Sequence, residues 1–157
     1  MSILAIDPGT ECSAFVLWDG DAILQHGMKT NREMSLWLRI GFMPQPVIVA
    51  ERIESYGMPV GREVFEAVFW TGRFAEACAG TLHQLPRRTV KLHLCGDSRA
   101  KDANIRAALI DRFGGRQSIR KGGALYGIHK DEWSALAIAV TWWDQGIAHE
   151  RSADHSS

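Results

Sequence analysis

Short apolar runs that end in a carboxylate occur twice along the chain. Residues 3–6 form the first run, which stops at Asp7 before a Pro-Gly pair. Residues 47–50 form the second run, which stops at Glu51. Continuous apolar runs bounded by turn formers are typical of central strands covered on both faces. We therefore predict two buried strands, each with an acidic residue at its carboxyl end.

The segment between the two runs predicts a hairpin and a helix. An Asp-Gly pair at 19–20 separates β-prone residues 13–18 from residues 21–26, a pattern that favours an antiparallel hairpin. A capping-box pattern at 30–33 begins a helix that ends near Gly41. A strand that follows a helical crossover most simply lies parallel to the neighbouring strand in the same sheet. Both carboxylates would then lie at the same edge of one sheet.

The second half of the chain predicts mainly helices. The expected elements are a helix over 62–80, a strand over 89–94, a helix over 97–113 and a closing helix over 131–144. In the helix over 62–80, Phe65, Val68 and Phe69 belong to an apolar stripe at three- and four-residue spacing. We expect this stripe to pack in the core, with a homodimer contact as the alternative. Gly72 in the same stripe predicts a close packing contact, because glycine disfavours a helix interior.

Composition indicates one globular domain of ordinary soluble type. The chain has 157 residues, of which 46% are hydrophobic and 23% charged. Three cysteines without paired spacing argue against disulfides and against a cysteine-based zinc site. No apolar run reaches the roughly 18 residues that a membrane span needs. We expect a cytoplasmic protein with a single domain over 1–145 and a frayed polar tail over 146–157.

Charge is balanced overall but unevenly distributed. The chain has 18 basic and 18 acidic residues, and basic residues concentrate between positions 87 and 121. A local patch says more about nucleic-acid binding than the total charge does. The candidate phosphate contacts are Arg99, Lys101, Arg116, Arg120 and Lys121. A solvated surface is the simpler alternative for each of them.

Four segments together resemble RuvC-type Holliday-junction resolvases, of the divergent kind found in phages. They are Ala-Ile-Asp-Pro-Gly-Thr at 5–10, Val-Ile-Val-Ala-Glu at 47–51, Gly-Asp-Ser-Arg-Ala-Lys at 96–101, and residues 131–141. They span nearly the whole chain in the family's order. The resemblance implies an α/β, ribonuclease H-like fold: a five-stranded mixed sheet, with three antiparallel and then two parallel strands, flanked by helices.

The resemblance further implies a metal-dependent endonuclease that hydrolyses DNA at four-way junctions. Two divalent ions about 4 Å apart activate the attacking water and stabilise the leaving oxygen. Hard ions such as Mg²⁺, for which Mn²⁺ can substitute, prefer carboxylate ligands. The implied ligands are Asp7 as the bridging residue, Glu51 and Asp131. Taken singly, these acids also suit a turn former, a solvated strand end and a favourable charge at a helix N-terminus.

The closing helix departs from the family pattern at one position. Bacterial members typically have a second acid three residues after the first, and this chain has Ser134 there. Either Asp131 binds the ion without a second acid, with Ser134 acting through a water, or Glu132 or His129 supplies a further ligand. Family members can have His at the earlier acidic position, which keeps His129 in view.

A four-way junction has approximate two-fold symmetry, so we expect a homodimer with one active site per subunit, formed through the helix over 62–80. The loop over 56–60 is a candidate to insert an apolar side chain between bases. Two other functions remain open from the sequence. One is a protein of the same fold that binds branched DNA without cutting it. The other is an actin-like or sugar-kinase-like nucleotide-binding fragment, which also begins with Asp-x-Gly-Thr but needs a second domain.

Overall fold

One mixed sheet organises the molecule. The computed structural model describes residues 1–156 and contains a five-stranded sheet in the order β3-β2-β1-β4-β5. The strands are β1 (Ile3–Asp7), β2 (Cys12–Trp18), β3 (Ile23–Thr30), β4 (Val47–Arg52) and β5 (Leu82–Pro86). β2 pairs antiparallel with both β1 and β3, whereas β4 pairs parallel with β1 and β5 pairs parallel with β4. The sheet expected from the sequence is confirmed.

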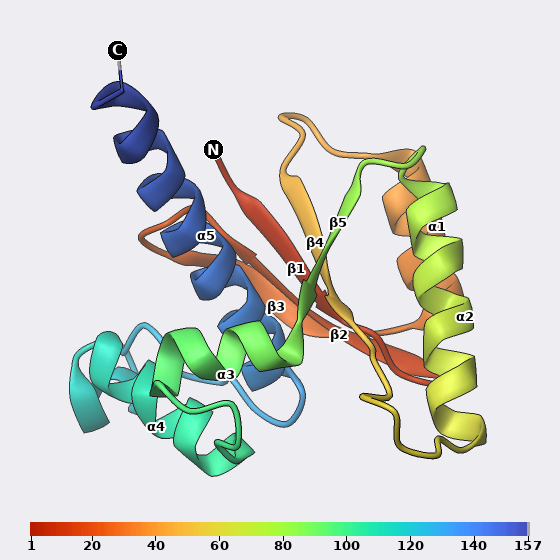
Figure 1. The fold of residues 1–157 in the computed structure, drawn as a ribbon. Coiled ribbons are helices and arrows are strands. Elements are labelled where there is room, and N and C mark those ends of the chain that lie inside the picture. Colours follow the sequence, from red (N-terminus) through yellow and green to blue (C-terminus); the bar gives the residue numbers. More distant parts are fainter. Residues whose placement is uncertain (157) are drawn as a thin grey trace.

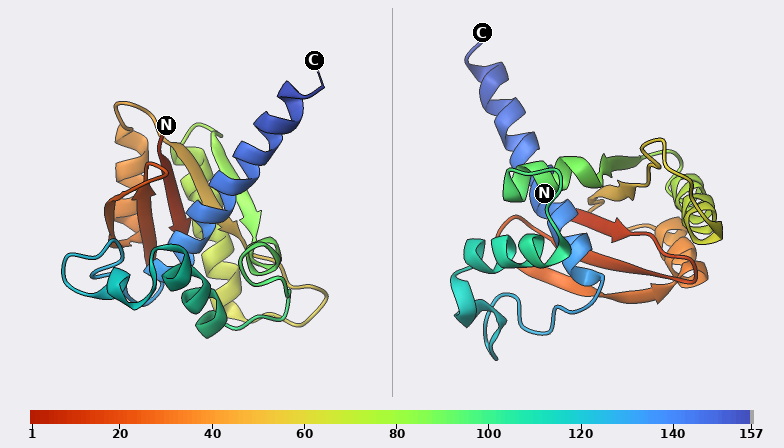
Figure 2. Two further views of the ribbon diagram at one scale, coloured as in Figure 1. Left: turned by 90° about the vertical axis from the view of Figure 1, so that its left-hand side faces the viewer. Right: turned by 60° about the horizontal axis from the view of Figure 1, so that its bottom comes forward.

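Helices cover both faces of this sheet (Figure 1). They are α1 (Asn31–Ile40), α2 (Arg62–Ala77), α3 (Arg87–Cys95), α4 (Asp102–Arg112) and α5 (Glu132–Asp154), with a 3-10 helix η1 (Gly115–Ile119). The pair α1 and α2 packs on one face, and α5 crosses the other face, with α3 and α4 beside it (Figure 2). No helix within residues 1–156 is both long enough and apolar enough to cross a membrane.

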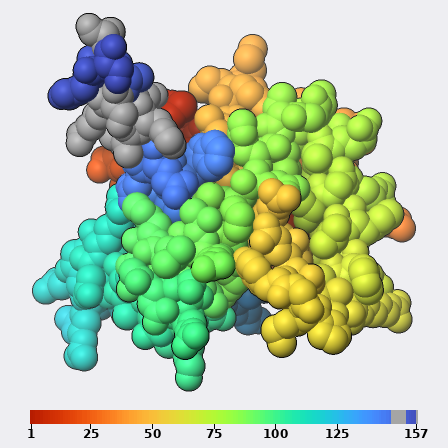
Figure 3. Space-filling view, in the orientation of Figure 1, coloured from red at the N-terminus to blue at the C-terminus, as the bar shows by residue number. Residues whose placement is uncertain are grey.

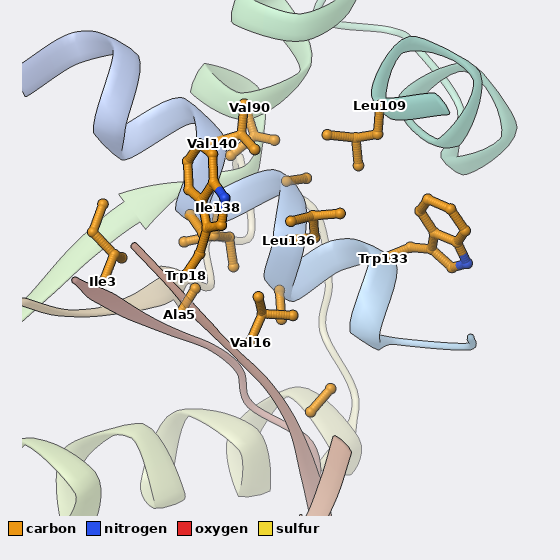
Figure 4. Packing of buried hydrophobic residues seen from close by; sticks show 14 of the residues in the cluster. Ile3, Ala5, Val16, Trp18, Val90, Leu109, Trp133, Leu136, Ile138 and Val140 are labelled. Carbon is orange, nitrogen blue, oxygen red and sulfur yellow. The ribbon is translucent and has the colours of Figure 1, made fainter. Parts of the chain in front are cut away.

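The alternation of β1 divides the core into two layers. Ile3 and Ala5 pack toward α5, in the cluster that Figure 4 shows from close by. Leu4 and Ile6 pack toward α1 and α2. Successive side chains of a strand point to opposite faces, so Asp7 continues the series that faces α5. The core thereby determines the face on which the first acid lies.

The last strand and the helix after it differ from the sequence prediction. Residues 89–94, predicted as a strand, lie in α3, and the strand is β5 at residues 82–86. β5 is an edge strand with a polar pattern, and Leu85 is its one buried residue, so its apolar signal is weak. Val90 and Leu94 lie four residues apart, on one helix face, and both contact the core under α5.

Two other helices differ from prediction in their ends. The helix expected to start at Asp97 begins at Asp102 instead. The residues before it form a turn, in which Asp97 Oδ1 accepts a hydrogen bond from the Arg99 backbone N–H at 2.8 Å. The closing helix α5 continues to Asp154. The polar tail expected over 146–157 therefore begins as helix, and its last residue, 157, lies outside the described residues.

The α2 helix presents the predicted apolar stripe to solvent and not to the core. Phe65, Val68 and Phe69 are 64%, 46% and 60% exposed. The buried face of α2 instead comprises Ala67, Thr71, Phe74 and Ala77. The expectation of core packing is therefore wrong for these three side chains. The expected close contact at Gly72 is also wrong within this chain, since a Cβ there would have no atom within 4 Å.

Candidate functional site

Asp7 and Glu51 lie side by side at the carboxyl ends of two parallel strands. In the register of β1 and β4, Ile6 is opposite Ala50, so the two acids follow at the same level. Val49 packs toward α5, and Glu51, two residues further along the strand, faces the same way as Asp7. Glu51 lies close enough to Asp7 for its charge to add to the effect of burial in raising the pKa of the Asp7 carboxyl. The two apolar runs thus deliver their carboxylates to one place, as the sequence predicts.

Asp131 adds a third carboxylate from α5, the helix that packs on this face of the sheet. It is the N-cap residue of α5, and its charge acts on Asp7. Burial, together with the charges of Glu51 and Asp131, raises the pKa of Asp7 from 3.8 to about 8. The charges of the other two acids that the sequence singled out therefore both act on Asp7, although the three residues are far apart in the chain.

Arg87 lies against the acidic group. It is the first residue of α3, directly after β5, and its Nη1 donates to Glu51 Oε1 at 3.3 Å. Its Nη2 forms an ion pair with Asp102 at the start of α4. Desolvation disfavours the charged guanidinium, but Glu51 and Asp102 outweigh it and raise the pKa of Arg87 above its ordinary value. Arg87 thus stays charged and partly offsets the negative charge of the site.

The donor set suits a hard divalent ion. Carboxylate oxygens are the ligands that Mg²⁺ and Mn²⁺ prefer. Burial first, and then the charges of Glu51 and Asp131, raise the pKa of Asp7, and a bound cation would favour its ionised form. Among the described residues, no three acidic, His or Cys side chains lie close enough together to hold an ion in their present positions. Glu51 is turned to Arg87 in this arrangement. The carboxylate donors therefore suit a divalent ion, and in this arrangement the Arg87 guanidinium supplies the positive charge at Glu51.

The turn after β1 is tied down by hydrogen bonds to neighbouring elements. The Gly9 N–H donates to Ser13 Oγ at 3.2 Å, and Asn31 Nδ2 donates to the Gly9 carbonyl at 2.9 Å. Ser13 Oγ in turn donates to Asn31 Oδ1 at 2.6 Å. A Cβ on Gly9 would lie 2.1 Å from the Cys12 carbonyl oxygen, so glycine is required there. This network holds the backbone directly after Asp7 in one conformation.

Glu132, an alternative metal ligand in the sequence prediction, is occupied elsewhere. Its side chain is fully buried, Oε1 contacts His26 Nδ1 and Oε2 lies 3.0 Å from His129 Nδ1. His26 belongs to β3, so this contact joins the start of α5 to the sheet. Glu132 and His129 thus contact each other, and no contact joins them to the acidic group. No local signal pairs His26 with Glu132, because 106 residues separate them.

Ser134 shares a cavity with Asp131. The cavity has a volume of about 270 Å³, and its lining includes Asp102, Arg106, Lys130, Asp131 and Ser134. Ser134 thus lies beside Asp131, and its part in binding an ion stays a prediction. Arg106 and Lys130, which sequence reasoning missed, bring positive charge to the same cavity. Lys130 has a φ of 52°, an uncommon conformation for a non-glycine residue, directly before the acid.

A second cavity of basic character lies on the other side of Arg87. Its volume is about 390 Å³, and it is lined by Tyr56, Arg87, Arg88, Lys91, Ser98 and Arg99. Figure 3 shows the loop after β4 lying beside the segment that contains α3. Acidic and basic surfaces are therefore adjacent, with Arg87 contacting both. Arg87 was not singled out from the sequence because the strand predicted over 89–94 obscured the start of α3.

The other predicted basic contacts are spread over a wider surface. Arg99 lines the basic cavity, whereas Arg116 and Arg120 line a hollow beside α4, and Lys121 one beside η1. Lys101 is exposed and directly precedes α4. The structure thus brings one of the five predicted contacts, Arg99, into the cavity next to the acids.

Comparison with known proteins gives a structural likeness without a sequence match. No protein-family model matches the chain, and no curated protein matches it. A Thermus thermophilus RuvC structure superposes with a TM-score of 0.68 at 14% identity, covering 90% of this chain and 92% of that one. T. thermophilus RuvC in complex with a Holliday junction substrate gives a TM-score of 0.62 at the same identity and coverage. The chain therefore has the ribonuclease H-like fold of RuvC-type resolvases.

Proposed function

We propose that this chain is a metal-dependent endonuclease that cleaves branched DNA, with the four-way junction as its substrate. The observation that carries the proposal is the group formed by Asp7, Glu51 and Asp131 beside a basic cavity. The shared fold supports it, since one structural neighbour is described as RuvC in complex with a Holliday junction substrate. Acids next to basic surface suit a substrate whose phosphates bind beside the place of cleavage.

Each acid has a distinct part in this proposal. The charges of Glu51 and Asp131 both act on Asp7, so Asp7 would be the ligand shared by the ions, with Glu51 holding one and Asp131 the other. Bound ions would supply an activated water and stabilise the charge on the leaving oxygen. Ser134, in the cavity beside Asp131, is placed to orient a water.

The basic side chains would hold the DNA backbone over the acids. Phosphate contacts orient the duplex without reading its sequence. Arg87 of the basic cavity contacts Glu51, Arg99 lines the same cavity, and Lys101 directly precedes α4. Arg116, Arg120 and Lys121 would contact the arms of the junction further away.

The α2 helix is the proposed homodimer interface. Phe65, Phe69 and Gly72 follow at four- and three-residue spacing and therefore lie on one exposed face. The open space at Gly72 allows a second backbone to approach closely. A two-fold symmetric dimer would present two active sites to the two strands of a junction.

Cleavage of a labelled synthetic four-way junction tests the proposal. Wild type with Mg²⁺ is expected to give paired nicks, while Asp7→Asn binds the junction and leaves it intact. A linear duplex of the same sequence serves as the substrate control. If the wild type binds the junction tightly but does not cleave it in Mg²⁺ or in Mn²⁺, the proposed nuclease activity is wrong. That result would favour a protein that binds branched DNA without cutting it.

A further inference from the structure

Arg87 joins two acidic side chains that belong to different elements. It is 3.3 Å from Glu51 on β4 and forms an ion pair with Asp102 at the start of α4. The Glu51 side chain is 14% exposed and that of Asp102 is 82% exposed. The contact with Glu51 is thus the more desolvated of the two, and charge interactions are stronger there than in open solvent.

A guanidinium at Glu51 and a divalent ion at Glu51 compete with each other. The guanidinium occupies acceptor capacity on one carboxylate oxygen and places a positive charge beside the acidic group. A divalent ion held by the same carboxylate would repel Arg87. The exposed Asp102 carboxylate is a second acceptor for the guanidinium. Arg87 can therefore leave Glu51 and still keep one ion-pair partner.

We propose that Arg87 is a positioning residue that holds Glu51 in the absence of a divalent ion and is displaced toward Asp102 when an ion binds. The inference rests on the proposed function, because it concerns the same acidic group. Arg87 thereby lowers the affinity of the site for the ion, because the contact between Arg87 and Glu51 must break before the ion can bind. The neighbouring Arg88 is exposed, lines the same basic cavity and contacts none of the three acids, which makes it a matched control.

Calorimetric titration of the DNA-free protein with Mn²⁺ tests this role without any measurement of cleavage. Arg87→Gln is expected to bind Mn²⁺ about three- to tenfold more tightly than wild type, because the competing cation is gone. Asp102→Asn is expected to bind it about two- to threefold more weakly, because Arg87 then has only Glu51. Arg88→Gln removes the same charge nearby and is expected to stay within about twofold of wild type.

Two results would overturn the proposal: Mn²⁺ affinity of Arg87→Gln equal to or weaker than that of wild type, or an equal gain in Arg88→Gln. Arg87→Lys, which keeps the charge but lacks the planar fork, is expected to fall between wild type and Arg87→Gln. It provides the comparison if the Gln variant does not fold, and an affinity below that of wild type would then overturn the proposal. If the Mn²⁺ affinities shift as predicted but the wild type does not cleave junctions, the proposed nuclease activity is wrong and the role of Arg87 stands. Mn²⁺ binding by neither wild type nor the variants overturns the role of Arg87.

Discussion

Asp7 and Glu51 occupy neighbouring parallel strands at the same level and on the same face of the sheet. Burial, together with the adjacent charges of Glu51 and Asp131, raises the pKa of Asp7 to about 8. Two carboxylates this close are stable together only with a proton or a cation between them. We therefore expect this pair to be the origin of the protein's response to pH and to a divalent ion.

Replacing Asp7 by Asn is expected to abolish cleavage and to stabilise the ion-free protein. The carboxyl has a folded pKa of about 8, against 3.8 for an ordinary aspartate. Its stability contribution is therefore complete below about pH 4 and declines as the pH rises toward 8. At pH 7 we expect Asp7→Asn to raise the free energy of unfolding by about 1–3 kcal/mol.

Urea unfolding in EDTA at pH 5 and pH 8 measures this effect. The wild type should lose stability between the two pH values, and Asp7→Asn should lose less. Saturating Mg²⁺ at pH 8 should remove most of the difference, because the ion takes the place of the proton. Equal pH dependence for the two proteins would contradict the raised pKa of Asp7.

Removing His26 is expected to leave Glu132 buried without its partner from β3. Glu132 has no exposed side-chain surface, so His26→Ala should cost about 2–4 kcal/mol of stability. The change should also lower cleavage, since Asp131 directly precedes Glu132. Thermal unfolding, followed with and without the second substitution Glu132→Gln, measures the coupling.

The double variant serves as the control for this pair. Because Gln needs less compensation than a buried carboxylate, His26→Ala with Glu132→Gln should be less destabilised than the sum of the single variants. Strict additivity would show that the two side chains do not depend on each other.

Replacing Phe69 by Lys on α2 is expected to give a monomer. The side chain is 60% exposed, so the substitution should change the stability of the monomer by no more than about 0.5 kcal/mol. Light scattering after size-exclusion chromatography measures the mass. Leu92→Lys, on the exposed side of α3 across the sheet, is the control and should remain dimeric. A wild type that is monomeric at every concentration tested would contradict the proposed interface.

Replacing Arg99 by Gln is expected to weaken junction binding and to lower its dependence on salt. Each phosphate contact contributes roughly one unit to the slope of log affinity against log salt. The slope for Arg99→Gln should therefore be smaller by about one. Arg39→Gln, an exposed change on α1 on the opposite face, is the control. The prediction fails if both variants give the wild-type slope when binding is followed by fluorescence anisotropy from 50 to about 300 mM salt.

Local pattern by itself determined the central strands and the acids at their ends. Buried strands carry their signal in a continuous apolar run, and a helical crossover leaves few arrangements for the strand that follows. The capping box at Thr30 and Glu33 is also local, and both of its hydrogen bonds are present. Asp7 and Glu51 were therefore predictable as neighbours before any coordinates.

Tertiary structure decided the features that depend on partners distant in the sequence. The strand β5 has one buried side chain and is recognisable only from its pairing with β4. The apolar stripe of α2 has the spacing of a core face, but Phe74 and Ala77 on another face are the residues that pack against the sheet. The contacts of Arg87 and of Glu132 likewise cross between elements. Periodicity reports which residues share a face, whereas packing of the whole chain decides which face is buried and which charges meet.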